Sequence, residues 1–145
     1  MPRLARLDIF RYWCSFYAWA LLSYHFHLLL MPTTTTLSSF IRRLLTGYAV
    51  SFNRRNMRFG HQFQNHYKSI YCEEETYLLE LVRYIHLNPL RAGMVKSLEE
   101  LDQYSLSGHA VLLGNRKLDR QETQEILERF GKKFHSARQT YRQFV

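Results

Sequence analysis

Residues 16–31 read FYAWALLSYHFHLLLM, and this stretch carries the clearest secondary-structure signal of the sequence. Two aromatic and aliphatic runs, Phe16–Leu22 and His25–Met31, are separated only by Ser23 and Tyr24. Apolar runs of this length on either side of a short break are typical of two β-strands joined by a tight turn. The sequence therefore predicts an antiparallel hairpin.

The second strand of this hairpin carries two histidines, His25 and His27, with one residue between them. Alternate residues of a strand face the same side, so both imidazoles are expected to project together while Phe26 faces the other side. Two adjacent imidazoles can bind one divalent ion and leave positions for oxygen ligands. An HxH pair alone more often binds nothing, so its spacing leaves both interpretations open.

A helix is predicted after the hairpin. Pro32 and Thr33–Thr36 end the strand pattern and offer an N-cap. From Leu37 to about Arg55, apolar residues recur at spacings of three and four, which indicates an amphipathic helix.

A second helix is predicted from about Tyr77 and is expected to end at Asn88, because Pro89 disfavours helical backbone in the residue before it. Gly93 is expected to close the next turn. Between the two helices, the alternation in His66–Cys72 indicates a strand.

The C-terminal part of the chain gives weaker signals. Asp119–Phe130 is predicted to be a helix that stops at Gly131. The last residues are basic and show little pattern.

The second helix places Tyr84 and Asn88 on one face, because residues four apart lie one turn from each other. A tyrosine hydroxyl near a metal-bound phosphate can act as a nucleophile, and an asparagine oxygen one turn away could complete the metal's coordination. The alternative is structural: Tyr84 packs in the core and Asn88 caps the helix end.

The charge of the 145-residue chain is strongly biased. Lys and Arg outnumber Asp and Glu by 20 to 12, a net charge of +8, and no acidic residue lies between Asp8 and Glu73. A field of one sign suits a polyanion such as nucleic acid, although a solvated surface is the alternative. Asn53–Lys68 mixes arginine, histidine, amide and aromatic side chains, as expected for phosphate contacts and base stacking.

Cys14 and Cys72 are the only cysteines, so a disulfide framework and a four-cysteine zinc site are excluded. This composition fits a reducing cytoplasm. The apolar run Tyr17–Met31 is too short to span a bilayer. We therefore expect a soluble cytoplasmic protein without a membrane partner.

Four segments, in this order, resemble the REP-associated branch of the single-tyrosine HUH transposases. They are YAWALL followed after two residues by HFHLLL, then RRLLTGYAVSFNRR, GHQFQNHYKSI and YLLELVRYIHLNPLRAG. The resemblance runs from about Tyr17 to Gly114. It implies an α+β fold with a ferredoxin-like antiparallel sheet and helices on one face.

The resemblance also implies a reaction. His25 and His27 would bind Mg²⁺ or Mn²⁺ with help from Asn88, and Tyr84 would attack a phosphodiester in single-stranded DNA. The products would be a 5′-phosphotyrosine link and a 3′-OH that can reverse the reaction at another site. The DNA would carry a short hairpin, and the protein would act at the nucleoid as a monomer or homodimer. The side chains expected to contact DNA are Arg42, Arg43, Arg54, Arg55, Arg58, His61, Gln64, Lys68 and Arg91.

The chain departs from the family in three places. Family members usually have Met-Pro-Asn where residues 22–24 are LSY, and Asn-Arg-Tyr-Lys where residues 65–68 are NHYK. Residues 1–16 are too few for a complete first strand and its crossover helix, which needs a dozen or more residues. We therefore expect an incomplete first strand and helix, a transposase domain over residues 1–114, and a short helical and basic tail over residues 115–145.

Three functional hypotheses follow. The chain is an active strand transferase, or a decayed and inactive copy that still binds DNA, or a small ferredoxin-like nucleic-acid-binding module without chemistry. The third leaves the HFH segment and the Tyr84–Asn88 pair unexplained.

Replacing Arg54 and Arg55 by alanine is expected to weaken DNA binding and to flatten its salt dependence. Every phosphate of single-stranded DNA that the protein no longer neutralises should reduce the slope of log K against log salt by about 0.7. Binding titrations at several salt concentrations measure this slope. An unchanged slope would remove both arginines from the interface.

Overall fold

The computed structural model describes residues 14–32, 36–56 and 75–145. The chain divides into two compact units, one of Met1–Cys14 with Pro32–Tyr71 and one of Ser15–Met31 with Cys72–Val145. Helices and an antiparallel sheet are both present, which confirms the α+β class. The strand predicted at 66–72 lies outside the described residues. None of the described helices is long and apolar enough to cross a membrane.

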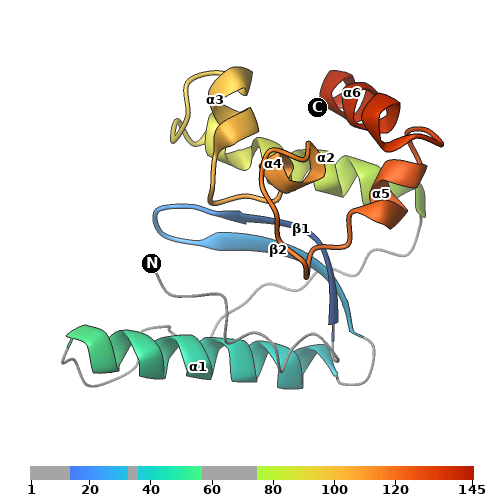
Figure 1. The fold of residues 1–145 in the computed structure, drawn as a ribbon. Helices are drawn as coiled ribbons and strands as arrows, with labels where there is room; N and C mark the ends of the chain where they lie inside the picture. The colour runs from blue at the N-terminus through green and yellow to red at the C-terminus, as the bar shows by residue number, and fades with distance from the viewer. Residues whose placement is uncertain (1–13, 33–35, 57–74) are drawn as a thin grey trace. The chain divides into compact units, whose positions relative to one another are not determined.

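The predicted hairpin is confirmed. Strand β1 (Cys14–Leu21) pairs with β2 (Phe26–Pro32) in a two-stranded sheet. The backbone N–H of Leu22 donates to the carbonyl of His25 at 2.9 Å and closes the turn between them. The helices of the second unit gather over one face of this hairpin (Figure 1).

The other edge of β1 is covered by short pieces of the C-terminal region. Isolated bridges join Phe16 to Gln121 and Ala20 to Ser107. Three backbone hydrogen bonds of 2.7–2.8 Å support them: Glu122 N–H to Phe16 O, Leu21 N–H to Leu106 O, and Gly108 N–H to Trp19 O. In the described part of the chain, β1 therefore has one full partner strand and two point contacts in place of a second strand.

The first predicted helix is confirmed as α1 (Leu37–Asn56) in the first unit. The hydroxyl of Thr36 accepts a hydrogen bond from the backbone N–H of Ser39 at 3.2 Å, so Thr36 is the N-cap. Phe40 and Ile41 are buried, as the apolar spacing predicted.

The second predicted helix is α2 (Glu75–Arg91), and its predicted end at Asn88 is wrong. Pro89 lies inside the last turn, where its missing N–H removes only one helical bond. The helix ends instead at Arg91, and Gly93, which has a φ of +72°, closes the turn after it. Gly93 N–H donates to Leu90 O and Met94 N–H donates to Pro89 O, which is the Schellman arrangement.

Four shorter helices follow in the second unit: α3 (Leu98–Gln103), α4 (His109–Leu112), α5 (Gln124–Glu128) and α6 (Phe134–Phe144). The helix predicted over Asp119–Phe130 is therefore too long at both ends. The first residues of the predicted segment are not helical, because Gln121 and Glu122 pair with β1. Helix α6 occupies the stretch in which the sequence showed little pattern.

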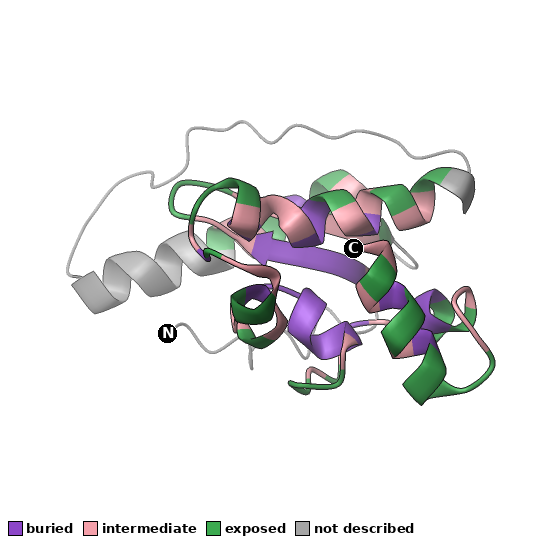
Figure 2. Cartoon of the chain, turned by 90° about the horizontal axis from the view of Figure 1, so that it is seen from above, coloured by how far each residue is buried: buried purple, intermediate pink, exposed green. Residues whose placement is uncertain are grey.

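The core of this unit joins β1 and α2 to the C-terminal helices. Its buried members are Tyr17, Ala18, Ala20, Val82, Ile85, Leu112, Ile126, Leu127, Ala137 and Tyr141. Figure 2 shows β1 and α4 as largely buried elements. Residues 115–145, which we expected to form a helical tail, thus supply four of the core side chains.

Gly108→Ala is expected to destabilise the fold by about 1–3 kcal/mol through overpacking. A β-carbon there would lie 2.7 Å from Gln121 Oε1 and 2.8 Å from His86 Nε2, and both side chains are buried. Gly131→Ala is the control, since its β-carbon would meet only ordinary contacts of 3.6 Å or more. Urea unfolding of both variants measures the difference, and equal stabilities would contradict the packing described.

Candidate active site

The two histidines of the hairpin lie together at the start of β2. The ring centroids of His25 and His27 are 5.1 Å apart, with the planes at 84°. The two side chains therefore share one side of the strand, as their spacing predicted. Burial, and secondly the charge of His25, lowers the pKa of His27 below its usual value. A neutral imidazole has a free lone pair, which is the form that binds a metal ion.

Tyr84 of α2 lies beside this pair. Its ring centroid is 6.0 Å from that of His27, edge to face at 81°. The side chain of Tyr84 is 46% exposed, so the phenol is not a core residue and remains open to a ligand. Helix α2 and the hairpin thus bring a tyrosine and two histidines, distant in sequence, to one place in the same chain.

Asn88 and Arg91 extend the same face of α2, because positions 84, 88 and 91 are four and three residues apart. The amide nitrogen of Asn88 donates to the backbone carbonyl of Tyr84 at 2.9 Å. The planar amide then directs its Oδ1 away from that carbonyl, where it could serve as an oxygen ligand. The guanidinium carbon of Arg91 lies 5.4 Å from the ring centroid of Tyr84, a cation–π distance.

Within the described residues, no group of three or more His, Cys, Asp and Glu side chains is arranged to hold a metal ion. A metal here would therefore depend on the imidazoles of His25 and His27 and on the amide oxygen of Asn88. Such a set leaves several positions open, which suits an ion that also binds substrate oxygens.

The predicted DNA-contacting residues are distributed unevenly. Arg42 and Arg43 are exposed on α1, in the first unit, and Arg91 belongs to the second. Arg54 and Arg55 fall on the last turn of α1, and the positions of their side chains are not described. The other four, Arg58, His61, Gln64 and Lys68, lie outside the described residues.

A buried chain of hydrogen bonds behind α2 was not predicted from the sequence. The hydroxyl of Tyr141 lies 2.8 Å from Nδ1 of His86 and 2.8 Å from Nδ1 of His109. Nε2 of His109 lies 2.8 Å from Oδ1 of Asp102, and Nε of Arg142 donates to the other carboxylate oxygen at 2.9 Å. The chain joins α2, α3, α4 and α6. The sequence does not predict this arrangement, because positions 86, 109 and 141 belong to separate helices and show no regular spacing.

The carboxylate of Asp102 sets the direction of every hydrogen bond in this chain. It accepts from His109 Nε2–H, so His109 Nδ1 accepts from the hydroxyl of Tyr141. The hydroxyl oxygen can then accept from Nδ1–H of His86. The remaining His86 Nε2 is unprotonated, buried, and without a hydrogen-bond partner among the described residues.

Burial has the largest effect on the pKa values of the three groups in this series of hydrogen bonds. It lowers the pKa of His86 well below the usual value, with a smaller contribution from His109. It also lowers the pKa of His109, against the opposing effect of the bond to Asp102. Burial raises the pKa of Tyr141 well above its usual value. All three groups are therefore neutral near pH 7.

Comparison with known protein families, curated proteins and solved structures found no match to this chain. The functional assignment therefore depends on the residues and their geometry.

The protein is expected to lose stability as the pH falls from 7 to 5. The pKa values of His86 and His109 lie below the unfolded value of 6.5, so under that pH the unfolded chain binds protons that the folded chain does not. Each group can contribute up to about 1.4 kcal/mol per pH unit. Urea unfolding at both pH values measures the change. His86→Gln should show a smaller decline, while His135→Gln, on the exposed face of α6, should behave like the unaltered protein. A decline that is the same in all three proteins would contradict the buried neutral state of His86.

Proposed function

We propose that this protein is a metal-dependent single-strand DNA endonuclease and strand transferase of the single-tyrosine HUH type, acting on hairpin DNA. The observation that carries the proposal is the contact between the phenol of Tyr84 and the imidazole of His27, beside His25. A packing role alone gives no reason for a half-exposed tyrosine to contact one member of a histidine pair. We further propose that the hairpin, with helices over one face, belongs to a ferredoxin-like sheet.

In this proposal Tyr84 is the nucleophile. Its Oη forms a bond to the phosphorus, and the bond from phosphorus to the 3′ oxygen of the preceding nucleotide breaks. The phenol proton ends on that 3′ oxygen, so a 5′-phosphotyrosine and a 3′-OH are formed and the atoms balance. The reverse reaction with another 3′-OH rejoins strands. Because Tyr84 and His27 belong to one chain, the nucleophile does not need to come from a partner subunit.

His25, His27 and Asn88 would hold the metal. A bound Mg²⁺ or Mn²⁺ supplies Lewis-acid neutralisation of charge on the phosphate oxygens. Imidazole nitrogen is a softer donor than Mg²⁺ prefers, so this set of donors favours Mn²⁺ between the two. Burial keeps His27 neutral and ready to bind.

Arg91 would assist both the phosphate and the phenol. Its guanidinium is exposed and lies over the ring of Tyr84. A cation there attracts the phosphate backbone and favours the phenolate form of Tyr84, which is the stronger nucleophile.

The alternative is a decayed copy that binds DNA without cleaving it. The feature that favours this alternative is the uneven covering of β1, one edge of which has only two isolated bridges among the described residues. Both proposals share the DNA partner, and they differ in covalent chemistry.

The purified protein, incubated with a labelled single-stranded hairpin oligonucleotide and Mn²⁺, is expected to form a covalent adduct that survives denaturing electrophoresis. Tyr84→Phe should abolish the adduct, because phenylalanine has no nucleophilic oxygen. Tyr77→Phe is the matched control, since Tyr77 is also exposed on α2 and should leave the adduct unchanged. EDTA added before the DNA should prevent adduct formation in the unaltered protein and in Tyr77→Phe.

Binding of the oligonucleotide without any adduct would support the decayed copy. A third outcome is that no adduct forms and that, with metal present, His25→Ala and His27→Ala bind the oligonucleotide as tightly as the unaltered protein does. That result would favour a binding module without chemistry.

A further inference from the structure

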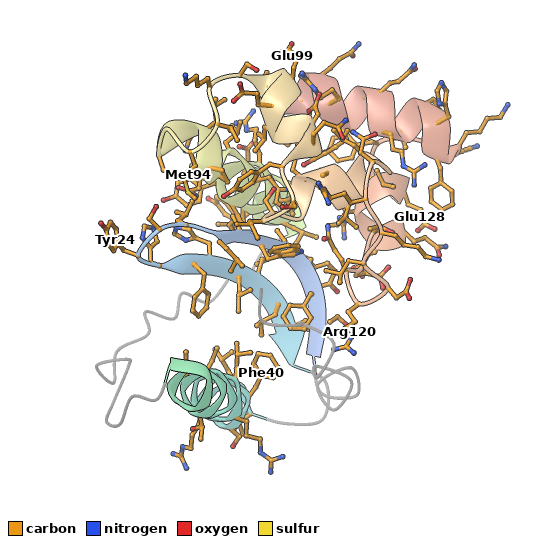
Figure 3. All side chains as sticks on the ribbon, turned by 60° about the vertical axis from the view of Figure 1, so that its left-hand side comes forward. Tyr24, Phe40, Met94, Glu99, Arg120 and Glu128 are labelled. Carbon is orange, nitrogen blue, oxygen red and sulfur yellow. The ribbon has the colours of Figure 1, made fainter. Side chains whose placement is uncertain are left out.

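The most exposed large apolar side chain among the described residues lies at the tip of the hairpin. Tyr24 is 98% exposed, against 59% for Tyr77 and 46% for Tyr84. Figure 3 shows Tyr24 pointing outward from the turn. The turn is closed by the hydrogen bond from Leu22 N–H to the His25 carbonyl. The fold gains nothing from this aromatic ring, since it buries almost no surface.

The position of Tyr24 in a tight turn makes its aromatic character unusual. Tight turns favour glycine, asparagine, aspartate and serine, which either adopt the required backbone or bond to it locally. A large ring at such a position is neither packed nor needed for the turn. An exposed aromatic side chain of this kind is available to a ligand that has a flat apolar face.

Tyr24 is also placed next to the candidate metal site. It precedes His25 directly, so the two α-carbons are about 3.8 Å apart. The ring of His25 in turn lies beside His27, which contacts Tyr84. Tyr24 is thus the exposed aromatic residue next in sequence to the histidine pair, and the nucleotides on either side of a phosphate at that pair are the ones it could stack with.

The hairpin carries no acidic side chain that would repel a polyanion. No acidic residue lies between Asp8 and Glu73, a stretch that includes the entire hairpin. Arg91 adds a cation over Tyr84 on the adjacent helix. Single-stranded nucleic acid combines the two chemistries that this surface offers, a phosphate backbone for cations and bases that stack on aromatic rings.

We propose that Tyr24 is a base-stacking residue that holds a nucleotide next to the phosphate that Tyr84 attacks. This inference rests on the proposed function, because it takes single-stranded DNA at the histidine pair as given. The unpaired base stacks on the exposed ring and fixes the strand beside the site. Stacking tolerates any base, so Tyr24 contributes affinity and placement more than sequence choice.

The test uses the full chain and a DNA hairpin with single-stranded oligothymidine flanks, each flank carrying 2-aminopurine in turn. Stacking on the ring should quench 2-aminopurine fluorescence at one flanking position. Tyr24→Ala should weaken binding roughly 5- to 150-fold and remove the quenching. Tyr24→Phe should keep both, because it keeps the ring. Phe134→Ala, which removes an exposed ring from α6 at the far end of the second unit from the turn (Figure 1), should change neither.

The salt dependence separates stacking from charge effects. Tyr24→Ala should shift the plot of log K against log salt without changing its slope, because the variant keeps every cation that neutralises a phosphate. Thermal unfolding of Tyr24→Ala should match the unaltered protein, since the side chain is almost fully exposed.

The outcomes distinguish this inference from the proposed function. Unchanged affinity and quenching in Tyr24→Ala would overturn the stacking role, even if the Tyr84 adduct forms. Weakened binding in Tyr24→Ala with no adduct in any protein would support stacking and reject cleavage. If the protein does not bind the hairpin DNA through either single-stranded flank, both the stacking role and the proposed function are wrong.

Discussion

The hydroxyl of Tyr141 is buried between two histidines and links three helices of this unit, α2, α4 and α6. It bonds His86 of α2 on one side and His109 of α4 on the other, and the chain continues to Asp102. Directional bonds of this kind fix the rotation of a helix in a way that apolar packing alone does not. His86 is two residues from Tyr84, so the two side chains project from nearly opposite sides of α2. Holding His86 inward therefore turns Tyr84 outward, toward the histidines of the hairpin.

The hairpin meets this helix through β1, whose buried residues share a core with α2 and the C-terminal helices. The turn that follows β1 carries Tyr24 and His25 to the exposed end of the unit, while β2 sets His27 next to Tyr84. The covering of β1 by Leu106–Gly108 and Gln121–Glu122 makes the last third of the chain part of this arrangement. The metal, the nucleophile and the stacking residue that we propose thus all depend on packing that comes from residues far along the sequence.

Local patterns predicted the elements of this fold better than their ends. The break at Ser23 and Tyr24 predicted the hairpin, and apolar spacing with a threonine cap predicted α1, because each depends on neighbouring residues alone. The end of α2 was missed because Pro89 loses only one bond in a last turn that Gly93 then closes. The helix before Phe130 was predicted too long because pairing with β1 competes for its first residues.

For the candidate site too, local features were predicted and the contact between distant segments was not. The spacing of His25 and His27 predicted that the imidazoles share a side, and the spacing of Tyr84 and Asn88 predicted one helix face. Neither spacing could predict that the hairpin and the helix meet, because that depends on the core that β1 shares with α2 and with residues far along the sequence. A helical tail was expected over residues 115–145, but the bounds of α6 were not predicted, because Ala137 and Tyr141 are its only fully buried side chains among mostly polar residues.

We propose that His25 and His27 bind a single metal ion within reach of Tyr84, and paramagnetic broadening by Mn²⁺ measures how close the three rings lie to that ion. Ring protons of all three residues, observed by NMR in the protein without DNA, should broaden together as Mn²⁺ is added. His25→Ala combined with His27→Ala should remove the broadening of Tyr84. Broadening of the histidines that leaves the Tyr84 ring sharp, or no broadening of any of the three, would contradict the account.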